Sequence, residues 1–237
     1  MKVIIASRMS SSRLPGKALK IMNKDKSMLD ILVHRIKSAH LVSGIILATS
    51  DHQSDDPLEE WAYKNKISIF RGSLDDVLGR LYSCINKFQI ENFVEILGDN
   101  PLVDPNDIDL CIKEFHSGLY DYVATSTTEY EYSNHEKSYP VGVRVQCLKS
   151  QLIINANAEN KDEYSREHSS SFIYKKSKRY KTKLIHYPHE RSNNIERLNL
   201  AVNTHDDFQR AARIFESLGV NVTLNDALRF IEHSNRK

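Results

Sequence analysis

The sequence predicts a doubly wound α/β fold, in which helices cover both faces of a mostly parallel sheet. Short apolar runs alternate with amphipathic stretches along the first half of the chain, as in successive βαβ units. Two polar loops directly follow apolar runs, and sheets of this kind bind ligands outside the carboxyl ends of their strands. The chain has 237 residues, 40% of them hydrophobic and 27% charged, which is enough for one domain spanning 1–237 with a full core.

Five apolar runs are predicted as strands: Val3–Ala6, Gly44–Thr49, Ile67–Phe70, Phe93–Leu97 and Tyr122–Ala124. The amphipathic stretches between them are predicted as helices: Met28–Ala39, Pro57–Asn65, Asp75–Phe88 and Pro105–His116. In the first of these, apolar side chains recur at the helical period, at Leu29, Leu32, Val33 and Ile36. Asp104 followed by Pro105 is typical of a helix N-terminus.

The alternation changes at about Thr125, and we predict an inserted or appended subdomain from there to about Arg191. Within it, "VGVRVQCL" alternates as a strand does, and the basic run Lys175–Lys183 is predicted to be a solvated edge strand protected by lysines. The last segment returns to the earlier pattern, with a strand at Leu200–Val202 and a helix from Asp206.

The charge balance argues against a nucleic-acid-binding protein, because the net charge is +2 and basic residues are interleaved with acidic ones. Contact of the run "YKKSKRYKTK" with nucleic acid or a membrane is the minority alternative. Cys84, Cys111 and Cys147 are odd in number and widely spaced, so we expect free or buried thiols. We expect a soluble, cytoplasmic protein, because the start reads as a strand and no window approaches the ~18 apolar residues of a membrane span.

The loop "SRMSSSRLPGKALK", Ser7 to Lys20, follows the first strand and contains four cations and no carboxylate. Its small residues allow backbone N–H groups to approach an anion closely. Arg8, Arg13 and Lys17 recur every four or five residues, so a curled loop would direct them at one polyphosphate. The pattern matches neither the P-loop nor the dinucleotide fingerprint. From the residues alone, a phosphate-binding loop and an ordinary solvated loop both remain open.

The same loop resembles the signature of the cytidylyltransferases that activate 3-deoxy-2-ulosonic acids, and its match is best to the spore-coat polysaccharide branch. Four further motifs are similar to that branch and follow in the same order: "FRGSLDDVLGR", "GDNPLVDP", "REHSSSFIY" and "LAVNTHDDF". Together the motifs span Ile4 to Phe208. The resemblance implies a nucleotide-diphospho-sugar transferase-like, Rossmann-like fold, with the inserted region serving acceptor binding and dimerisation.

The resemblance also implies a reaction: transfer of CMP from CTP to a sugar acid, with release of pyrophosphate. Arg13 and Lys17 would hold the β- and γ-phosphates, and Arg8 would lie against the phosphates or the ribose. The backbone of Ser10, Ser11 and Ser12 would supply further donors. With Asp99, Arg13 and Lys17 are the predicted catalytic residues.

Asp99 is the predicted Mg²⁺ ligand, because it follows an apolar strand and lies next to Gly98. Asn203 stands where the family has a second metal-binding Asp, and its neutral oxygen attracts a hard cation less. Three interpretations stay open. Asn203 still binds the metal beside Asp99, phosphates and water; or Asp206 or Asp207 supplies the charge, although capping of the next helix suits them better; or catalysis is weak or absent.

Nucleotide recognition is assigned to the second motif, at Arg71, Gly72, Ser73 and Arg80, although Arg80 has an alternative partner in Asp76 at i, i−4. The acceptor's carboxylate needs a cation, and the candidates are Arg144, Arg166 and His168. His168 is also open to interpretation as a core histidine. Gly142 matches a family P-x-G, whereas Gln146 replaces the family's usual Glu, which points to an altered sugar pocket.

Two other functions remain open at this stage. One is a cytidylyltransferase for a non-sugar acceptor, such as a phosphonate or phosphorylated alcohol. The other is a non-catalytic nucleotide-binding protein, which Asn203 motivates. The family also implies a homodimer, for which the Tyr-rich stretch Tyr130–Val145 is a candidate contact.

Overall fold

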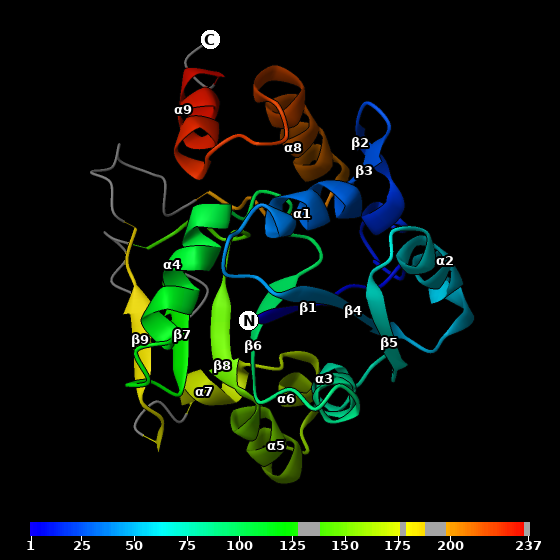
Figure 1. Cartoon of the computed structure of the whole chain (residues 1–237). Coiled ribbons are helices and arrows are strands. Elements are labelled where there is room, and N and C mark those ends of the chain that lie inside the picture. The colour runs from blue at the N-terminus through cyan, green and yellow to red at the C-terminus, as the bar shows by residue number, and fades with distance from the viewer. Residues whose placement is uncertain (128–137, 176–178, 188–197, 235–237) are drawn as a thin grey trace.

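A seven-stranded sheet in the order β5-β4-β1-β6-β8-β7-β9 forms the centre of the molecule (Figure 1). The computed structural model describes residues 1–127, 138–175, 179–187 and 198–234. The parallel part of the sheet contains β1 (Lys2–Ala6), β4 (Gly44–Ser50), β5 (Ser68–Gly72) and β6 (Asn92–Leu97). β8 (Gln146–Lys149) pairs antiparallel with both β6 and β7 (Tyr122–Thr125), and β9 (Thr182–Ile185) pairs parallel with β7 at the edge. The predicted α/β class is therefore confirmed.

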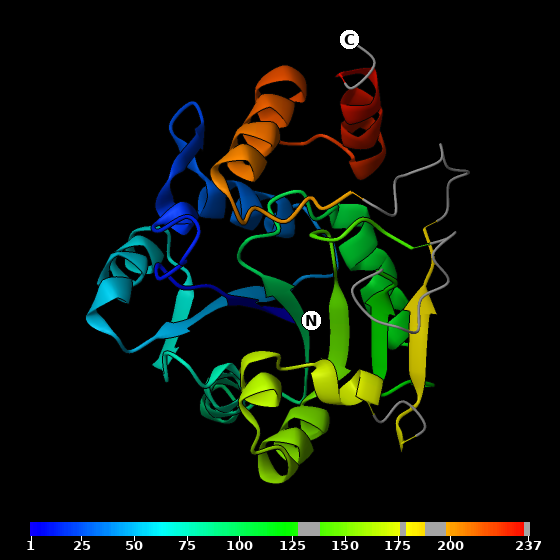
Figure 2. The ribbon, with the colours of Figure 1, turned by 180° about the vertical axis from the view of Figure 1, so that it is seen from behind.

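Helices cover both faces of this sheet (Figures 1 and 2). One face packs against α1 (Met28–Lys37), α2 (Asp56–Lys64) and α4 (Pro105–Phe115). The other packs against α3 (Val77–Lys87), α5 (Ser150–Glu159) and α7 (Ser171–Lys175), with α6 (Glu163–Glu167) beside α3. β1 supplies both cores because its side chains alternate, with Val3 and Ile5 on one face and Ile4 on the other.

A third apolar cluster forms around the C-terminal helices α8 (His205–Leu218) and α9 (Leu224–Ser234). These helices pack with α1 and with the small hairpin of β2 (Ile21–Asn23) and β3 (Lys26–Ser27). The buried Arg35 side chain of α1 connects the segment before α4 to the segment between α8 and α9: its Nε donates to the Val103 carbonyl at 2.8 Å, and its Nη1 donates to the Val220 carbonyl at 2.7 Å.

Most predicted elements occur within a few residues of their expected bounds, but the region after Thr125 differs from the prediction in three places. The run Val141–Leu148 becomes a strand only from Gln146. Leu200–Val202 is not a strand, since Asn199 makes an isolated bridge to Val141 and the chain then bends toward α8. The edge strand begins at Thr182, so the basic run contributes only its end; residues 176–178 lie outside the described residues.

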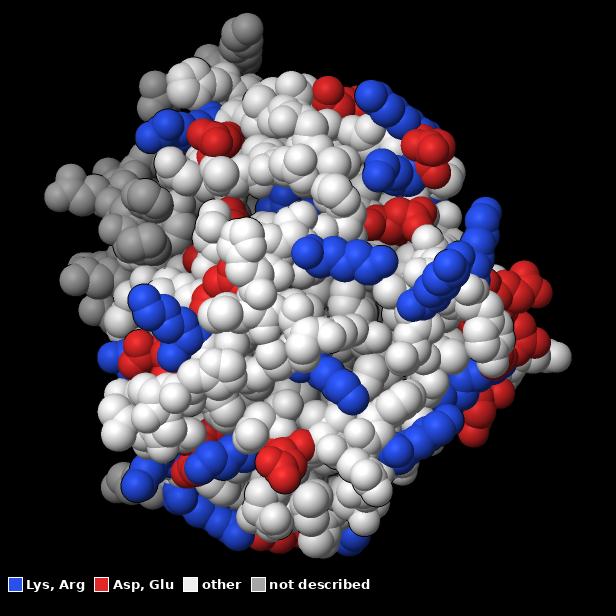
Figure 3. All heavy atoms as spheres, viewed as in Figure 1, with Lys and Arg blue, Asp and Glu red and all other residues white. Residues whose placement is uncertain are grey.

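Other sequence-based expectations concern the surface and the thiols. Cys84, Cys111 and Cys147 are buried and free, as predicted. On the face shown in Figure 3, basic and acidic side chains are interspersed. None of the helices within the described residues combines the length and apolar character that crossing a bilayer requires. Half of the Tyr-rich stretch proposed for dimerisation, residues 130–137, lies outside the described residues.

We expect the carboxyl group of Asp107 to make folding stability depend on pH. Burial, and next the Asp104 charge, raise the pKa of Asp107 from 3.8 to about 7, although Tyr139 donates a hydrogen bond to it. Between these pH values the native state keeps a proton that the unfolded chain has lost, so stability falls as pH rises from about 4 to about 7. In urea denaturation at pH 5 and 8, Asp107→Asn should remove this fall and stabilise the protein at pH 8 by on the order of 1–3 kcal/mol.

Glu114→Gln is the matched control on the same helix, because Glu114 has no side-chain hydrogen bond or ion pair within the described part of the chain. It should leave the pH dependence unchanged. An unaltered pH dependence in Asp107→Asn would contradict the assignment.

Candidate active site

A cleft of about 380 Å³ opens at the carboxyl ends of β1 and β6. From β1 the chain crosses to β4 on one side, while β6 lies on the other, so this is the switch point of the sheet. The structure brings together here many of the residues predicted from separate motifs: Arg8, Ser10, Ser11, Ser12, Arg13, Lys17, Arg80, Asp99, His168 and Asn203. Glu167 also lines the cleft, although the sequence analysis did not select it.

The loop after β1 curls around a single backbone oxygen, the Met9 carbonyl. The N–H groups of Ser11 and Gly16 donate to it at 2.9 and 3.0 Å. Gly16 has φ +73°, a left-handed conformation that favours glycine, and it directly precedes the 3₁₀ turn Lys17–Leu19. Gly98 allows the loop to lie against β6, because a Cβ there would collide with the Ser7 side chain.

Lys17 joins three parts of the chain. Its Nζ donates to Asp99 Oδ2 at 3.0 Å, to the Val202 carbonyl at 2.7 Å and to Asn203 Oδ1 at 3.4 Å. The Lys17 and Asp99 side chains are only 12% and 25% exposed, so this ion pair is less screened than a surface pair. Three oxygens from two distant motifs therefore converge on one cationic group.

Two further cationic side chains line the cleft, and they have few anionic partners within the described part of the protein. Arg13 is exposed, and the described residues offer it no hydrogen bond or ion pair. Arg8 donates to the Leu74 carbonyl at 3.1 Å and lies 3.7 Å from the exposed carboxylate of Glu167. Both guanidinium groups are thus placed to receive an anion from solvent.

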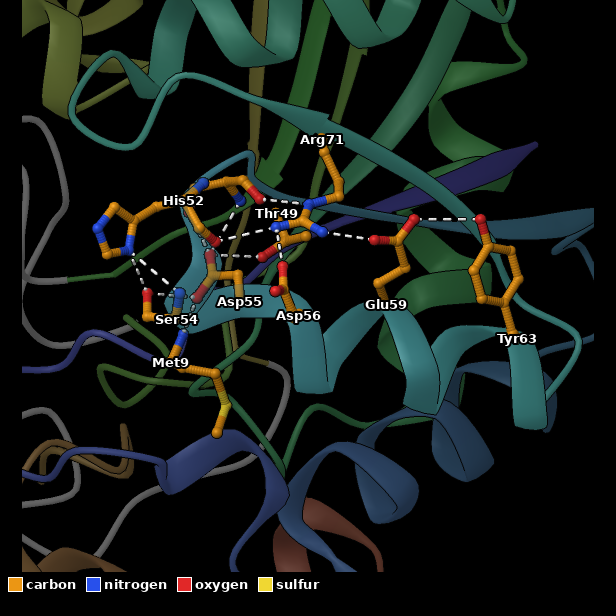
Figure 4. A network of polar contacts seen from close by, with 10 residues as sticks. Met9, Thr49, His52, Ser54, Asp55, Asp56, Glu59, Tyr63 and Arg71 are labelled. Atoms are coloured by element: carbon orange, nitrogen blue, oxygen red, sulfur yellow. Dashed lines mark hydrogen bonds and ion pairs between the residues drawn. The ribbon is translucent and has the colours of Figure 1, made fainter.

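The second motif is divided between the cleft and the scaffold. Arg80 is 3% exposed, lines the cleft and donates to the Ser73 carbonyl at 2.9 Å, and no ion pair to Asp76 forms. Arg71 lies outside the cleft. It pairs with Asp56 at 2.7 Å and with Glu59 on α2, and it donates to the carbonyls of Ser50 and His52 (Figure 4). Gly72 and Ser73 do not line the cleft either.

The predicted acceptor residues are divided in the same way. Gly142 and Arg144 line a smaller hollow of about 70 Å³, which shares Leu97, Asp99 and Asn203 with the main cleft. Gly142 has φ +91°, and a Cβ there would overlap the backbone of Ala201, so glycine is required for packing.

Arg166 reaches neither hollow. It pairs with Asp76 and donates to Asn157 Oδ1 at 2.8 Å. His168 follows α6, lines the main cleft and has its ring against that of Tyr164. The structure therefore retains His168 as a candidate at the cleft and places Arg166 in the scaffold.

The residues around Asp99 suit a single hard cation. Asp99 and Asn203 already direct oxygens at one ammonium group, and oxygen ligands suit Mg²⁺. No cluster of three or more His, Cys, Asp or Glu side chains that could hold a metal occurs among the described residues. Asp207 caps α8 and pairs with Arg210 at 2.8 Å, and neither Asp206 nor Asp207 lines the cleft.

A comparison with models of protein families shows which family the chain belongs to. Residues 2–222 match the model of the cytidylyltransferase family. The chain belongs to this family. It is 29% identical to the spore coat polysaccharide biosynthesis protein SpsF of Bacillus subtilis (strain 168), over 91% of this chain and 86% of that protein.

Solved cytidylyltransferase structures share the fold. A cytidylyltransferase from Leptospira borgpetersenii superposes with a TM-score of 0.85 at 23% identity, covering 99% of this chain and 94% of that one. A CMP:2-keto-3-deoxy-manno-octonic acid synthetase complexed with CTP superposes with a TM-score of 0.62 at 15% identity, covering 90% and 97%.

Asp55 positions the loop of this cytidylyltransferase, and sequence analysis did not select it. The side chain is fully buried beside the end of β4 (Figure 4). Its Oδ1 accepts from the Met9 N–H at 2.7 Å, and its Oδ2 accepts from Thr49 Oγ1 at 2.8 Å and from the N–H and hydroxyl of Ser50. Burial alone would raise the pKa of Asp55, but the hydrogen bonds from Ser50, Met9 and Thr49 outweigh it and lower the pKa. The only signal in the sequence was an Asp shortly after a strand, which occurs at many turns.

We expect Asp55→Asn to destabilise the protein by about 2–4 kcal/mol, because the new amide directs N–H groups at backbone and hydroxyl donors. We also expect the KM for CTP to rise, since the loop loses its tether at Met9. Urea denaturation and initial-rate kinetics measure the two effects.

The neighbouring Asp56→Asn is a matched control, because it removes the same charge from a side chain that is 58% exposed. Asp56→Asn should lower the free energy of unfolding by less than about 1 kcal/mol and leave the KM for CTP unchanged. Equal effects of the two substitutions would show that Asp55 does not tether the loop.

Proposed function

We propose that this chain transfers CMP from CTP to a small sugar acid of the 3-deoxy-2-ulosonic or nonulosonic type, releasing pyrophosphate, in the synthesis of a surface polysaccharide or glycan. The observation that carries the proposal is the convergence of Arg8, Arg13 and Lys17 with Asp99 in one cleft. Membership of the cytidylyltransferase family supports the transfer, and similarity to a spore coat polysaccharide biosynthesis protein supports the pathway class.

In this reaction an acceptor hydroxyl oxygen attacks the α-phosphorus of CTP, and the bond to the bridging oxygen breaks as pyrophosphate leaves. Such chemistry depends mainly on positioning and on neutralising charge. Arg13 and Arg8 would bind the phosphates, because they have few protein anions as partners. The backbone at Ser10–Ser12 would add donors, and Arg80 would contact the base or ribose from the cleft wall.

Mg²⁺ bound with the triphosphate would neutralise charge between phosphate oxygens. Asp99 and Asn203 would hold it, because their oxygens converge on one point. In the free protein Lys17 neutralises Asp99 from that point. The phosphates of CTP would offer the Lys17 ammonium a second anionic partner in the same cleft.

The acceptor would lie between the main cleft and the smaller hollow, because the two share the wall that contains Asp99 and Asn203. His168 and Arg144 line the main cleft and the smaller hollow respectively, and they are the proposed contacts to the acceptor. A homodimer is proposed from the family resemblance.

Pyrophosphate release from CTP tests this function, measured with and without Mg²⁺ across a panel of ulosonic and nonulosonic acids, with a phosphonate and a phosphorylated alcohol as further acceptors. We expect turnover with at least one sugar acid and none without a divalent cation. CTP binding without turnover of any acceptor would instead indicate a non-catalytic nucleotide-binding protein. Turnover of only a phosphonate or a phosphorylated alcohol would indicate the other acceptor class.

We expect Lys17→Ala to lower kcat/KM for CTP by about 100-fold or more, because it removes a phosphate-binding cation and leaves Asp99 without its ion pair. Lys20→Ala is the matched control from the same loop, since the Lys20 ammonium lies over the Phe208 ring and outside the cleft. Its kinetics should stay within about twofold of the wild type. Unchanged kinetics in Lys17→Ala would refute the phosphate role.

We expect Asn203→Asp to tighten Mn²⁺ or Mg²⁺ binding by about tenfold, because it adds a second carboxylate where two oxygens already converge. Titration calorimetry in the presence of CTP measures this change independently of turnover. Asp206→Asn should leave metal affinity unchanged, because Asp206 does not line the cleft. If Asn203→Asp leaves the metal affinity unchanged, this position does not bind the metal.

A further inference from the structure

The smaller hollow beside the main cleft has a buried carboxylate in its wall. Its volume is about 70 Å³, against about 380 Å³ for the main cleft, so it suits one functional group of a ligand that lies mainly in the main cleft. The lining residues come from β6, β8 and the segments before β8 and α8: Glu95, Leu97, Asp99, Asn100, Gly142, Arg144, Gln146, Ala201 and Asn203. Glu95 matched none of the family motifs in the sequence.

Glu95 lies in the middle of β6, on the same face of the sheet as Phe93 and Leu97. Its side chain is 1% exposed. Oε1 accepts from the Ser169 hydroxyl at 2.7 Å, and Oε2 accepts from Gln146 Nε2 at 3.3 Å. The Ser169 bond comes from the "REHSSS" motif, from a residue that does not line the hollow.

These two neutral donors leave the carboxylate incompletely satisfied. A carboxylate offers about four acceptor positions, and one of the two bonds is long. No Lys, Arg or His of the described residues lies within ion-pair distance of Glu95. Burying a carboxylate is costly, and burial raises the pKa of Glu95, although the Ser169 hydrogen bond and the Arg144 charge offset part of this rise. The group also faces the hollow.

A chain of hydrogen bonds orients the wall around Glu95. Arg144 Nη2 donates to the Tyr122 hydroxyl at 2.6 Å, and that hydroxyl donates to Gln146 Oε1 at 2.8 Å. The carbonyl of the Gln146 amide is thereby directed toward Tyr122 and its NH₂ toward Glu95. A glutamate at position 146 would direct a second carboxylate at Glu95, so the amide suits this wall.

We propose that this hollow is an acceptor subsite that receives a hydrogen-bond-donating substituent, a hydroxyl or an amino group, which donates to Glu95. Glu95 is then a specificity residue for the transfer, and this inference rests on the proposed function. A donor would add the missing bond to the buried carboxylate. An anionic substituent there would face Glu95 and Asp99 as well as Arg144, so next to Glu95 the subsite favours a hydrogen-bond donor over an anion.

The test uses 2-keto-3-deoxy-manno-octonic acid, its amino analogues and its singly deoxygenated forms as acceptors for the intact 237-residue chain. We expect Glu95→Gln to raise the KM of the preferred acid about tenfold or more, while the KM for CTP changes less than about twofold. One deoxygenated form should be used poorly by the wild type and be insensitive to Glu95→Gln. Glu95→Gln should raise the KM of the analogue with an amine at that same position more than it raises the KM of the parent acid, because the ammonium group loses a charged partner.

Glu91→Gln is the matched control, because it removes an exposed glutamate just before β6, at the end of the strand remote from the cleft. Ser169→Ala removes a bond to Glu95 without touching the hollow, and the KM of the acid should rise less than in Glu95→Gln. Melting temperature and the KM for CTP show whether each variant is folded.

Turnover of an acid whose KM is unchanged in folded Glu95→Gln would overturn the subsite while leaving the proposed function intact. If Glu95→Gln does not fold, equal use by the wild type of the parent acid and all its deoxygenated forms would overturn the subsite. If the wild type binds CTP but turns over none of the acids, the proposed acceptor class fails, and the subsite fails with it.

Discussion

The three hydrogen bonds of the Lys17 ammonium hold the cleft together. They connect the loop after β1 to Asp99 at the end of β6 and to Val202 and Asn203 before α8. Because the donor and its acceptors are 82 to 186 residues apart in sequence, the site exists only once the sheet and the C-terminal layer have come together. In the free protein this partly buried ammonium and its oxygen partners hold one another in place, because each would be costly to leave unpaired.

Two buried carboxylates near this site differ in how fully they are hydrogen-bonded, and that difference separates a structural role from a binding role. Asp55 accepts four hydrogen bonds from Met9, Thr49 and Ser50, so it needs no ligand and holds the loop. Glu95 accepts two and faces a hollow. The first arrangement tethers the loop that is proposed to bind phosphate. The second leaves binding capacity for the acceptor, next to the wall where its reacting hydroxyl would have to lie.

The candidate site was predictable where the chemistry lies within a short motif. Arg8, Arg13 and Lys17 follow one strand, so their shared location required only the fold class. Arg71 was predicted from the second motif to recognise the nucleotide, and Arg166 was predicted as a cation for the acceptor's carboxylate. Their guanidinium groups instead bind acidic partners on α2 and before α3. Charge alone does not distinguish a ligand-binding arginine from a scaffold arginine, because nearby carboxylates decide which it becomes. Asp55 and Glu95 were not predicted from the sequence, because their roles depend on hydrogen-bond partners that come together only in the folded chain.

The sequence by itself determined the α/β class, the bounds of β1, β4, β5, β6 and β7 to within a few residues, and the position of the cationic loop after β1, because hydrophobic period and turn chemistry are local properties. It did not determine that β8 enters the sheet antiparallel between β6 and β7, or that residues 200–202 run alongside Asp99 without forming a strand. Tertiary structure decided these features because they depend on pairing between distant segments. The pairing of Lys17 with Asp99 and the hollow beside Glu95 have the same origin, since each becomes a site only through neighbours contributed by other elements.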